Sequence, residues 1–280
     1  MKLPMKARYC YLKDQIIAEN HAKINVNERG FLFGDGVFET IRFQNSKIYN
    51  FLHHENRLIS GLKELKINFN CDNLLKISKQ LIAKNNQQDG ILRIYISRGQ
   101  GSNGYAPQQN IQPLLLIQTK DLPKTPKFPI ILGLSPYQKP SIKSLPVNYK
   151  YAANLNSILV KLYAKEKHHF DDVILNLSGH ICETASANIF WIKNNILFTP
   201  NLSCGALDGS IRSKIINLSP IQVTQGQFPI STLNNADEIF ISNATNLLLK
   251  VDKLSFTNKS FLQNKYHQIF TNLLKKDLLG

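Results

Sequence analysis

The stretch that decides the fold runs from Lys150 to Asn188 and ends in Cys182-Glu183-Thr184-Ala185-Ser186-Ala187-Asn188. Between its two ends lie a basic run with helical spacing, an apolar strand-like run over residues 173–175 and a turn. Lys150 and Glu183 are 183 − 150 = 33 positions apart. A lysine can form a Schiff base with an aldehyde cofactor, and a carboxylate can accept a hydrogen bond from that cofactor's ring nitrogen. The pair therefore favours a cofactor-dependent enzyme.

The composition is typical of a globular protein with a substantial core. The chain has 280 residues, of which 43% are hydrophobic, enough for one large domain or two modest ones. Its net charge of +15 raises nucleic-acid binding as a possibility. However, the lysines are scattered, and no block of five or six like charges occurs. We therefore interpret the charge as a lysine-rich surface and expect no nucleic-acid partner.

The cysteines indicate a reducing compartment. Cys10, Cys71, Cys182 and Cys204 form no C-x-x-C pair, and no histidine cluster has zinc-ligand spacing. We expect free buried thiols and no metal. The first six residues do not begin a signal peptide, and no run of 18 apolar residues occurs. These features predict a cytoplasmic protein without a membrane partner.

Short apolar runs alternate with segments of helical periodicity in both halves of the chain. The pattern predicts an α/β protein of two α+β domains. Proline-containing residues 121–129 form the best linker candidate, so we expect an N-terminal domain over 1–120 and a C-terminal domain over 130–280. The main expected elements are a hairpin over 8–18, helices over 51–65, 75–83, 152–168 and 260–278, and strands over 37–43, 91–96, 114–119, 130–134, 172–177, 188–193 and 196–199.

Four motifs stand in order along the chain. They are Phe33-Gly34-Asp35-Gly36-Val37-Phe38-Glu39-Thr40, Lys150-x-x-x-Asn154, Glu183-x-x-x-x-Asn188-Ile189-Phe190 and Leu207-Asp208-Gly209-Ser210-Ile211-Arg212. In this order and spacing they resemble the fold-type IV pyridoxal-phosphate enzymes, or class IV aminotransferases. That family includes branched-chain and D-amino-acid aminotransferases and 4-amino-4-deoxychorismate lyases. The resemblance implies a D-amino-acid aminotransferase-like fold, a larger barrel-like C-terminal domain that binds pyridoxal 5'-phosphate, and a homodimer.

The resemblance also implies a role for each matched residue. Lys150 is expected to carry the cofactor and, once released, to act as general base. Glu183 is expected to accept a hydrogen bond from the ring nitrogen and keep that nitrogen protonated. The phosphate is expected to bind Arg57 and the backbone N–H groups of a helix start and a strand end. Those N–H groups belong to Ser210, Ile211, Ala244 and Thr245, the last with its hydroxyl as well.

Three features favour the lyase branch of the family. Thr40 stands where the lyases carry a threonine thought to relay a proton. The loop Ser97-Arg98-Gly99-x-Gly101-x-x-Gly104-Tyr105 and the turn Ser242-Asn243-Ala244 are similar to those of the lyases. They imply a lyase of folate biosynthesis that makes 4-aminobenzoate and pyruvate from 4-amino-4-deoxychorismate.

One position departs from the lyase pattern. Asn103 replaces an arginine of the loop, and the lyase substrate carries two carboxylates that an arginine would bind. We therefore expect Arg98 or Arg42 to bind the substrate, with Tyr105 beside it in a loop that serves the neighbouring subunit's site. The alternative is an aminotransferase acting on branched-chain L-amino acids or on D-amino acids. A basic nucleic-acid-binding module is a third hypothesis from another class.

Overall fold

The structure is a computed structural model that describes residues 8–101, 104–257 and 259–279. The chain divides into two compact units. The first comprises Met1–Leu122 together with Tyr149–Ala153, and the second comprises Pro123–Asn148 together with Asn154–Gly280.

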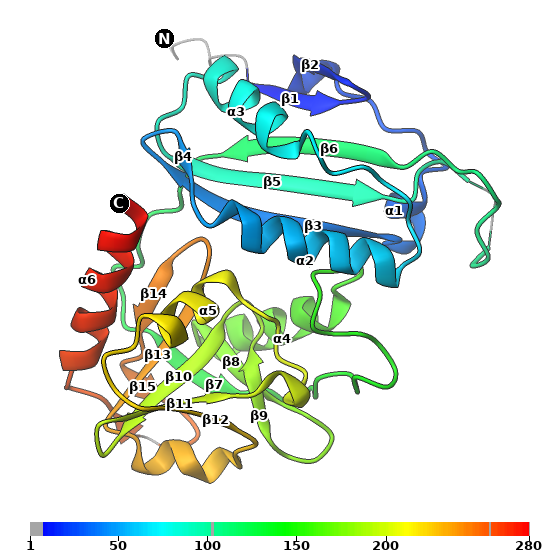
Figure 1. Cartoon of the computed structure of the whole chain (residues 1–280). Coiled ribbons are helices and arrows are strands. Elements are labelled where there is room, and N and C mark those ends of the chain that lie inside the picture. Colours follow the sequence, from blue (N-terminus) through cyan, green and yellow to red (C-terminus); the bar gives the residue numbers. More distant parts are fainter. Residues whose placement is uncertain (1–7, 102–103, 258, 280) are drawn as a thin grey trace. The chain divides into compact units, whose positions relative to one another are not determined.

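The first unit is built on a six-stranded antiparallel sheet with the strand order β2-β1-β6-β5-β3-β4. Helices α2 and α3 lie along the same face of this sheet (Figure 1). The strands are β1 (Tyr9–Leu12), β2 (Gln15–Ala18), β3 (Gly36–Gln44), β4 (Lys47–Ile48), β5 (Gly90–Ser97) and β6 (Leu114–Lys120). The helices are η1 (Glu19–His21), α1 (Arg29–Phe33), α2 (Phe51–Glu64) and α3 (Leu74–Lys84).

Strand β3 separates the core of this unit from the face that its helices leave uncovered. Side chains alternate along a strand, so residues two apart share a face. Val37, Ile41 and Phe43 are buried in the core cluster with Leu58 and Leu62 of α2. Between them, Phe38, Thr40 and Arg42 are half-buried and point to the opposite face. That face is therefore available for polar chemistry.

Residues 149–153 pair with the start of β3. The N–H of Phe38 donates to the carbonyl of Lys150 at 2.9 Å, and the N–H of Ala152 donates to the carbonyl of Gly36 at 2.9 Å. The sequence analysis places Lys150 in the C-terminal domain, whereas the structure places it in the first unit. The pairing satisfies backbone groups that the edge of β3 would otherwise leave open. Because these residues are extended, the next helix begins at Leu155 rather than at 152.

The second unit contains two five-stranded sheets, with the strand orders β12-β11-β10-β13-β14 and β16-β15-β7-β8-β9. The strands are β7 (Ile131–Leu134), β8 (Asp171–Leu175), β9 (Ile181–Thr184), β10 (Asn188–Lys193), β11 (Ile196–Pro200), β12 (Val223–Gly226), β13 (Glu238–Asn243), β14 (Leu247–Lys250), β15 (Lys253–Leu254) and β16 (Lys259–Ser260). The helices are α4 (Leu155–Glu166), η2 (Leu202–Cys204), α5 (Ser210–Asn217), η3 (Ile230–Asn235) and α6 (Lys265–Leu279).

One apolar cluster joins the two sheets of the second unit. Leu132 and Val173 come from one sheet, and Ile189, Trp191 and Ile239 come from the other. All five are at most 2% exposed, so the two sheets bury a shared core. The predicted mixture of helices and strands is confirmed in both units. Strand β9, which carries Glu183, was not predicted, because four residues are too few to show a clear period.

Candidate functional site

Lys150 lies over an aromatic ring of the first unit. Its Nζ is 4.2 Å from the centre of the Phe38 ring, and the guanidinium carbon of Arg93 is 5.9 Å from the same centre. Both are cation–π contacts, in which the negative face of the ring attracts the cation. Phe38 thus places two cationic side chains on the uncovered face of the sheet.

Thr40 and Arg42 continue along this face. Thr40 stands directly opposite Arg93 in the β3–β5 pairing, and Arg42 stands opposite Ile91. Burial lowers the pKa of Arg42, although the charge of Asp89 opposes this effect. The sequence analysis did not predict Arg93 as a candidate residue. It could have been noticed, because it is the one charged residue in the apolar run 91–96.

Arg57 is held on the core side of β3 by a buried carboxylate. Its Nε donates to Oε1 of Glu39 at 2.7 Å, and a terminal nitrogen donates to Oε2 at 2.6 Å. Nδ1 of His54 lies 2.6 Å from the same Oε2. Such a two-point contact fixes the plane of the guanidinium. The role of Arg57 as a phosphate ligand stays a prediction.

The Glu39 group predicts how acid destabilises the protein. Burial raises the pKa of Glu39, but the charge of Arg57 and the hydrogen bonds from His54 and Arg57 outweigh burial and lower it from 4.5 to about 2. The resulting stability is complete above pH 4.5 and is lost as the pH falls towards 2. By linkage it amounts to about 3 kcal/mol. The free energy of unfolding can be measured by urea unfolding followed by circular dichroism between about pH 6 and pH 3. It should fall less steeply with decreasing pH in Glu39→Gln than in the wild type. Equal slopes would contradict this prediction.

Glu183 lies in β9 of the second unit, where three groups among the described residues contact its carboxylate. Its Oε1 forms an ion pair with Nζ of Lys139. Its Oε2 accepts the backbone N–H of Leu207 at 3.0 Å and Nδ2 of Asn188 at 3.4 Å. The carboxylate is buried, so these donors replace the hydrogen bonds that it would make with water. Lys139 was missed, because in the sequence it resembles any other surface lysine.

Helix α5 presents its first turn close to this carboxylate's partners. The N-cap residue Gly209 has no side chain to cap the helix, and Ser210 and Ile211 are buried. A Cβ on Gly209 would lie 2.0 Å from Oδ1 of Asn188, so only glycine fits there. The N–H groups of a first turn point along the helix axis and attract anions. This arrangement fits the predicted phosphate contacts of Ser210 and Ile211.

The turn after β13 holds the other two predicted phosphate ligands, Ala244 and Thr245. Oδ1 of Asn243 accepts the N–H of Thr245 at 3.0 Å and that of Asn246 at 2.8 Å. A phosphate contact by the Thr245 N–H would therefore share this donor with Asn243. The roles of Ala244 and Thr245 stay predictions.

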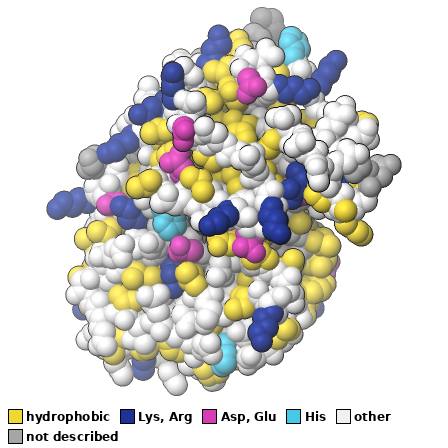
Figure 2. Space-filling view, turned by 45° about the vertical axis from the view of Figure 1, so that its right-hand side comes forward, with side chains coloured by type: hydrophobic (Ala, Val, Ile, Leu, Met, Phe, Trp, Pro, Cys, Tyr) yellow, Lys and Arg dark blue, Asp and Glu magenta, His cyan; other side chains and the backbone are white. Residues whose placement is uncertain are grey.

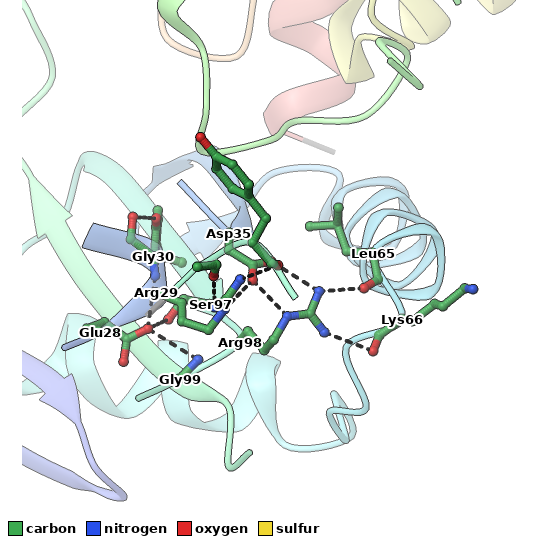
Figure 3. A network of polar contacts seen from close by, with 12 residues as sticks. Glu28, Arg29, Gly30, Asp35, Leu65, Lys66, Ser97, Arg98 and Gly99 are labelled. Carbon is green, nitrogen blue, oxygen red and sulfur yellow. Dashed lines mark hydrogen bonds and ion pairs between the residues drawn. The ribbon is translucent and has the colours of Figure 1, made fainter. Parts of the chain in front are cut away.

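Arg98 is engaged in a network within the first unit (Figure 3). Its Nε donates to Oδ2 of Asp35 at 2.8 Å, and its terminal nitrogens donate to the carbonyls of Leu65 and Lys66 at the end of α2. Arg29 donates to the same Asp35 oxygen at 2.8 Å. The guanidinium of Arg98 thus already has three partners, and its predicted substrate role would require it to exchange them.

The loop that follows Arg98 is tied to Arg29. Two terminal nitrogens of Arg29 donate to the carbonyls of Gly104 and Tyr105 at 2.8 and 2.9 Å. The Tyr105 ring lies 5.8 Å from that of Phe33, and Tyr105 is 90% exposed. Asn103 stands where the lyases carry a carboxylate-binding arginine, and it lies outside the described residues. The substrate role of Tyr105 stays a prediction.

Comparison with known proteins identifies the family to which this geometry belongs. Residues 36–254 match the model of the amino-transferase class IV family. The chain belongs to the class IV aminotransferase family. It is 26% identical to a D-alanine aminotransferase of Staphylococcus aureus over 250 residues, which cover 87% of this chain and 88% of the relative.

Solved class IV structures share the whole fold. A Legionella pneumophila protein, provisionally assigned as 4-amino-4-deoxychorismate lyase, is 26% identical with a TM-score of 0.84 and covers 92% of this chain and 97% of its own. The branched-chain amino acid aminotransferase from Escherichia coli is 24% identical with a TM-score of 0.89, and the match covers 95% of this chain and 92% of its own. The predicted class IV fold is therefore confirmed.

Class IV enzymes use pyridoxal 5'-phosphate, and the residues of this chain fit that cofactor. A buried carboxylate, Glu183, suits a protonated ring nitrogen. The first turn of α5 suits a phosphate. Oγ of Ser242 is buried without a hydrogen-bond partner among the described residues, as is Nε of Arg212. Such orphaned polar atoms call for a hydrogen-bond partner that the described residues do not supply.

Other kinds of site find less support in the part of the chain that the structure describes. The four cysteines are free and buried there. No cluster of three His, Cys, Asp or Glu residues suited to a metal occurs among the described residues. Within the same residues, no helix has the length and apolar character needed to span a membrane. On the face drawn in Figure 2, lysine and arginine side chains lie dispersed among apolar and neutral ones.

Proposed function

We propose that this class IV enzyme is a lyase that eliminates pyruvate from 4-amino-4-deoxychorismate to give 4-aminobenzoate. The observation that carries the proposal is the position of Thr40. It shares one face of β3 with Phe38, whose ring centre lies 4.2 Å from Nζ of Lys150. A hydroxyl two residues along the same strand face is a suitable proton relay for a reaction based at Lys150. The Legionella relative supports the same activity.

The charge on this face also suits the substrate. The substrate carries two carboxylates, and Arg42 and Arg93 lie on the same sheet face as Thr40. Guanidinium groups bind carboxylates through two parallel hydrogen bonds. We propose that these two arginines bind the substrate carboxylates in place of the loop arginine that Asn103 replaces. Arg98 and Tyr105 remain proposed substrate residues of the loop.

Each residue has a defined task in the proposed reaction. Bound pyridoxal 5'-phosphate supplies an electron sink for the substrate carbon that bears nitrogen. The Lys150 amine removes the proton from that carbon, and Glu183 holds the ring-nitrogen proton. Arg57, Ser210, Ile211, Ala244 and Thr245 bind the phosphate. The carbon–oxygen bond between the substrate ring and the enolpyruvyl group breaks, and the ring becomes aromatic. Thr40 delivers a proton to the methylene carbon of the departing enolpyruvyl group, which becomes pyruvate.

The decisive assay measures pyruvate release from 4-amino-4-deoxychorismate with no keto acid added. We expect the wild type to release pyruvate and 4-aminobenzoate in equal amounts over many turnovers. Thr40→Val should slow release about 100-fold, the usual contribution of a positioned proton donor, with unchanged cofactor content. Thr40→Ser keeps the hydroxyl and should retain most of the rate. Absence of pyruvate from the wild type would reject the lyase proposal.

The second candidate is an aminotransferase for branched-chain L-amino acids or D-amino acids. It is favoured by the 26% identity to the Staphylococcus aureus D-alanine aminotransferase. Under this proposal, an amino acid alone converts the cofactor stoichiometrically to its pyridoxamine form, and a keto acid restores it. A panel of D- and L-amino acids, followed by cofactor absorbance, separates the two activities.

The remaining parts of the proposal concern context. We place the reaction in folate biosynthesis in the cytoplasm and propose a homodimer. We propose the domain bounds 1–120 and 130–280, joined by the linker 121–129, with residues 149–153 returning to the first domain. The nucleic-acid hypothesis is tested by salt-dependent DNA binding of the purified chain, which the lyase proposal does not expect.

A further inference from the structure

Lys139 is directed towards Glu183 by the fold of the second unit. It follows β7, and its backbone N–H donates to the carbonyl of Leu175 at the end of β8 at 2.8 Å. The residue is only 9% exposed. Its Cγ lies 3.3 Å from the point that a Cβ on Gly205 would occupy, and Gly205 has a φ of +94°. The glycine therefore leaves space for the stem of the lysine, and its backbone conformation disfavours other residues.

Two cations among the described residues act on the Glu183 carboxylate. The guanidinium of buried Arg212, in α5, interacts with it through its charge. The ammonium of Lys139 forms an ion pair with it, and the side chains of this pair are 11% and 9% exposed. The other two donors to Glu183, the Leu207 N–H and the Asn188 amide, are neutral and both bind Oε2. A buried carboxylate without a cationic partner tends to take up a proton. Lys139 therefore compensates the buried charge and fixes the direction of Oε1.

We propose that Lys139 is a positioning residue that holds the Glu183 carboxylate in place through their ion pair and thereby directs it to the cofactor's ring nitrogen. This inference rests on the proposed role of Glu183. An ionised carboxylate only accepts hydrogen bonds and so favours a protonated ring nitrogen, whereas a protonated one can donate instead. Lys139 acts through Glu183 and not on the substrate.

The test measures binding of pyridoxal 5'-phosphate to the apoprotein, by absorbance and fluorescence titration, across pH. Lys139→Gln keeps a donor but loses the charge that compensates the buried carboxylate, so its affinity should be about tenfold lower than that of the wild type and should depend differently on pH. Lys139→Arg should restore the wild-type profile, and the exposed control Lys143→Gln should not change it.

A double variant separates this role from a merely structural one. In a Glu183→Gln background the carboxylate that Lys139 positions is gone, so adding Lys139→Gln should change the affinity less than about twofold. Melting of each apoprotein checks folding, and Lys139→Met serves as the uncharged variant if Lys139→Gln does not fold. A wild-type pH profile in the uncharged variants, with weakened binding in Glu183→Gln, would overturn the role of Lys139 alone. Unchanged binding in Glu183→Gln would overturn the role of Glu183 and this inference with it.

Discussion

Replacing Lys150 with alanine should reduce turnover by at least about 10³-fold and abolish covalent attachment of the cofactor. The lysine amine is expected to serve both as covalent anchor and as general base, and no other group replaces both functions. The measurement is twofold. Pyruvate release or transamination gives the rate, and borohydride reduction followed by peptide mass spectrometry locates the cofactor. In the wild type, the cofactor mass should lie on the peptide that contains residue 150.

The structure indicates that this variant will fold. Lys150 is held by its backbone, since its carbonyl accepts the N–H of Phe38 and the neighbouring Ala152 N–H binds Gly36. Alanine preserves these bonds, so the melting temperature of the apoprotein should stay close to that of the wild type. Lys150→Arg keeps a cation near the Phe38 ring but not a free amine, and should be equally inactive. A Lys150→Ala enzyme within about tenfold of wild type would refute the assignment.

The second large effect concerns the stability of the first unit. Asp35 is the shared acceptor of Arg29 and Arg98, and the side chain of Arg29 is only 2% exposed. Burial raises the pKa of Asp35, but hydrogen bonds from Arg98 and Arg29 outweigh it and lower the pKa. Asp35→Ala leaves a buried guanidinium without its carboxylate, which costs roughly 3–5 kcal/mol. Hydrogen exchange of peptides from β3 and β5 should accelerate accordingly.

An exposed ion pair in the same unit provides the matched control. Arg8 binds Asp121 at 2.9 Å, but the Asp121 side chain is 78% exposed. Solvent screens such a pair, so Asp121→Ala should cost less than about 1 kcal/mol. If both variants exchange at the same rate as the wild type, the network in Figure 3 does not stabilise the unit as argued.

The sequence predicts those features that periodicity and residue type encode. The alternation of Val37–Phe43 and the helical spacing of Leu58, Leu62 and Leu65 predicted β3 and α2 in nearly the observed bounds. Lys150 and Glu183 were predicted as site residues because their residue types and spacing match a motif. These signals are local, so the sequence carries them without knowledge of the fold.

Features that depend on long-range contacts could not be predicted in the same way. The pairing of Ala152 with Gly36 uses backbone groups, which every residue possesses. Lys139 becomes distinct only once β7, β8 and Gly205 bury its stem. Arg98 was predicted to bind the substrate, and only the fold brings Asp35 and the end of α2 to its guanidinium.

The return of residues 149–153 to β3 has a consequence for synthesis on the ribosome. The contiguous part of the first unit ends at Leu122, but its last backbone pairings need Ala152 to have left the exit tunnel. By then residues 123–148, which belong to the second unit, have also emerged. Domains usually mature one after another as the nascent chain lengthens. Here the first unit can complete its backbone pairing only after residues 149–153 have been translated, and these follow residues 123–148 of the second unit.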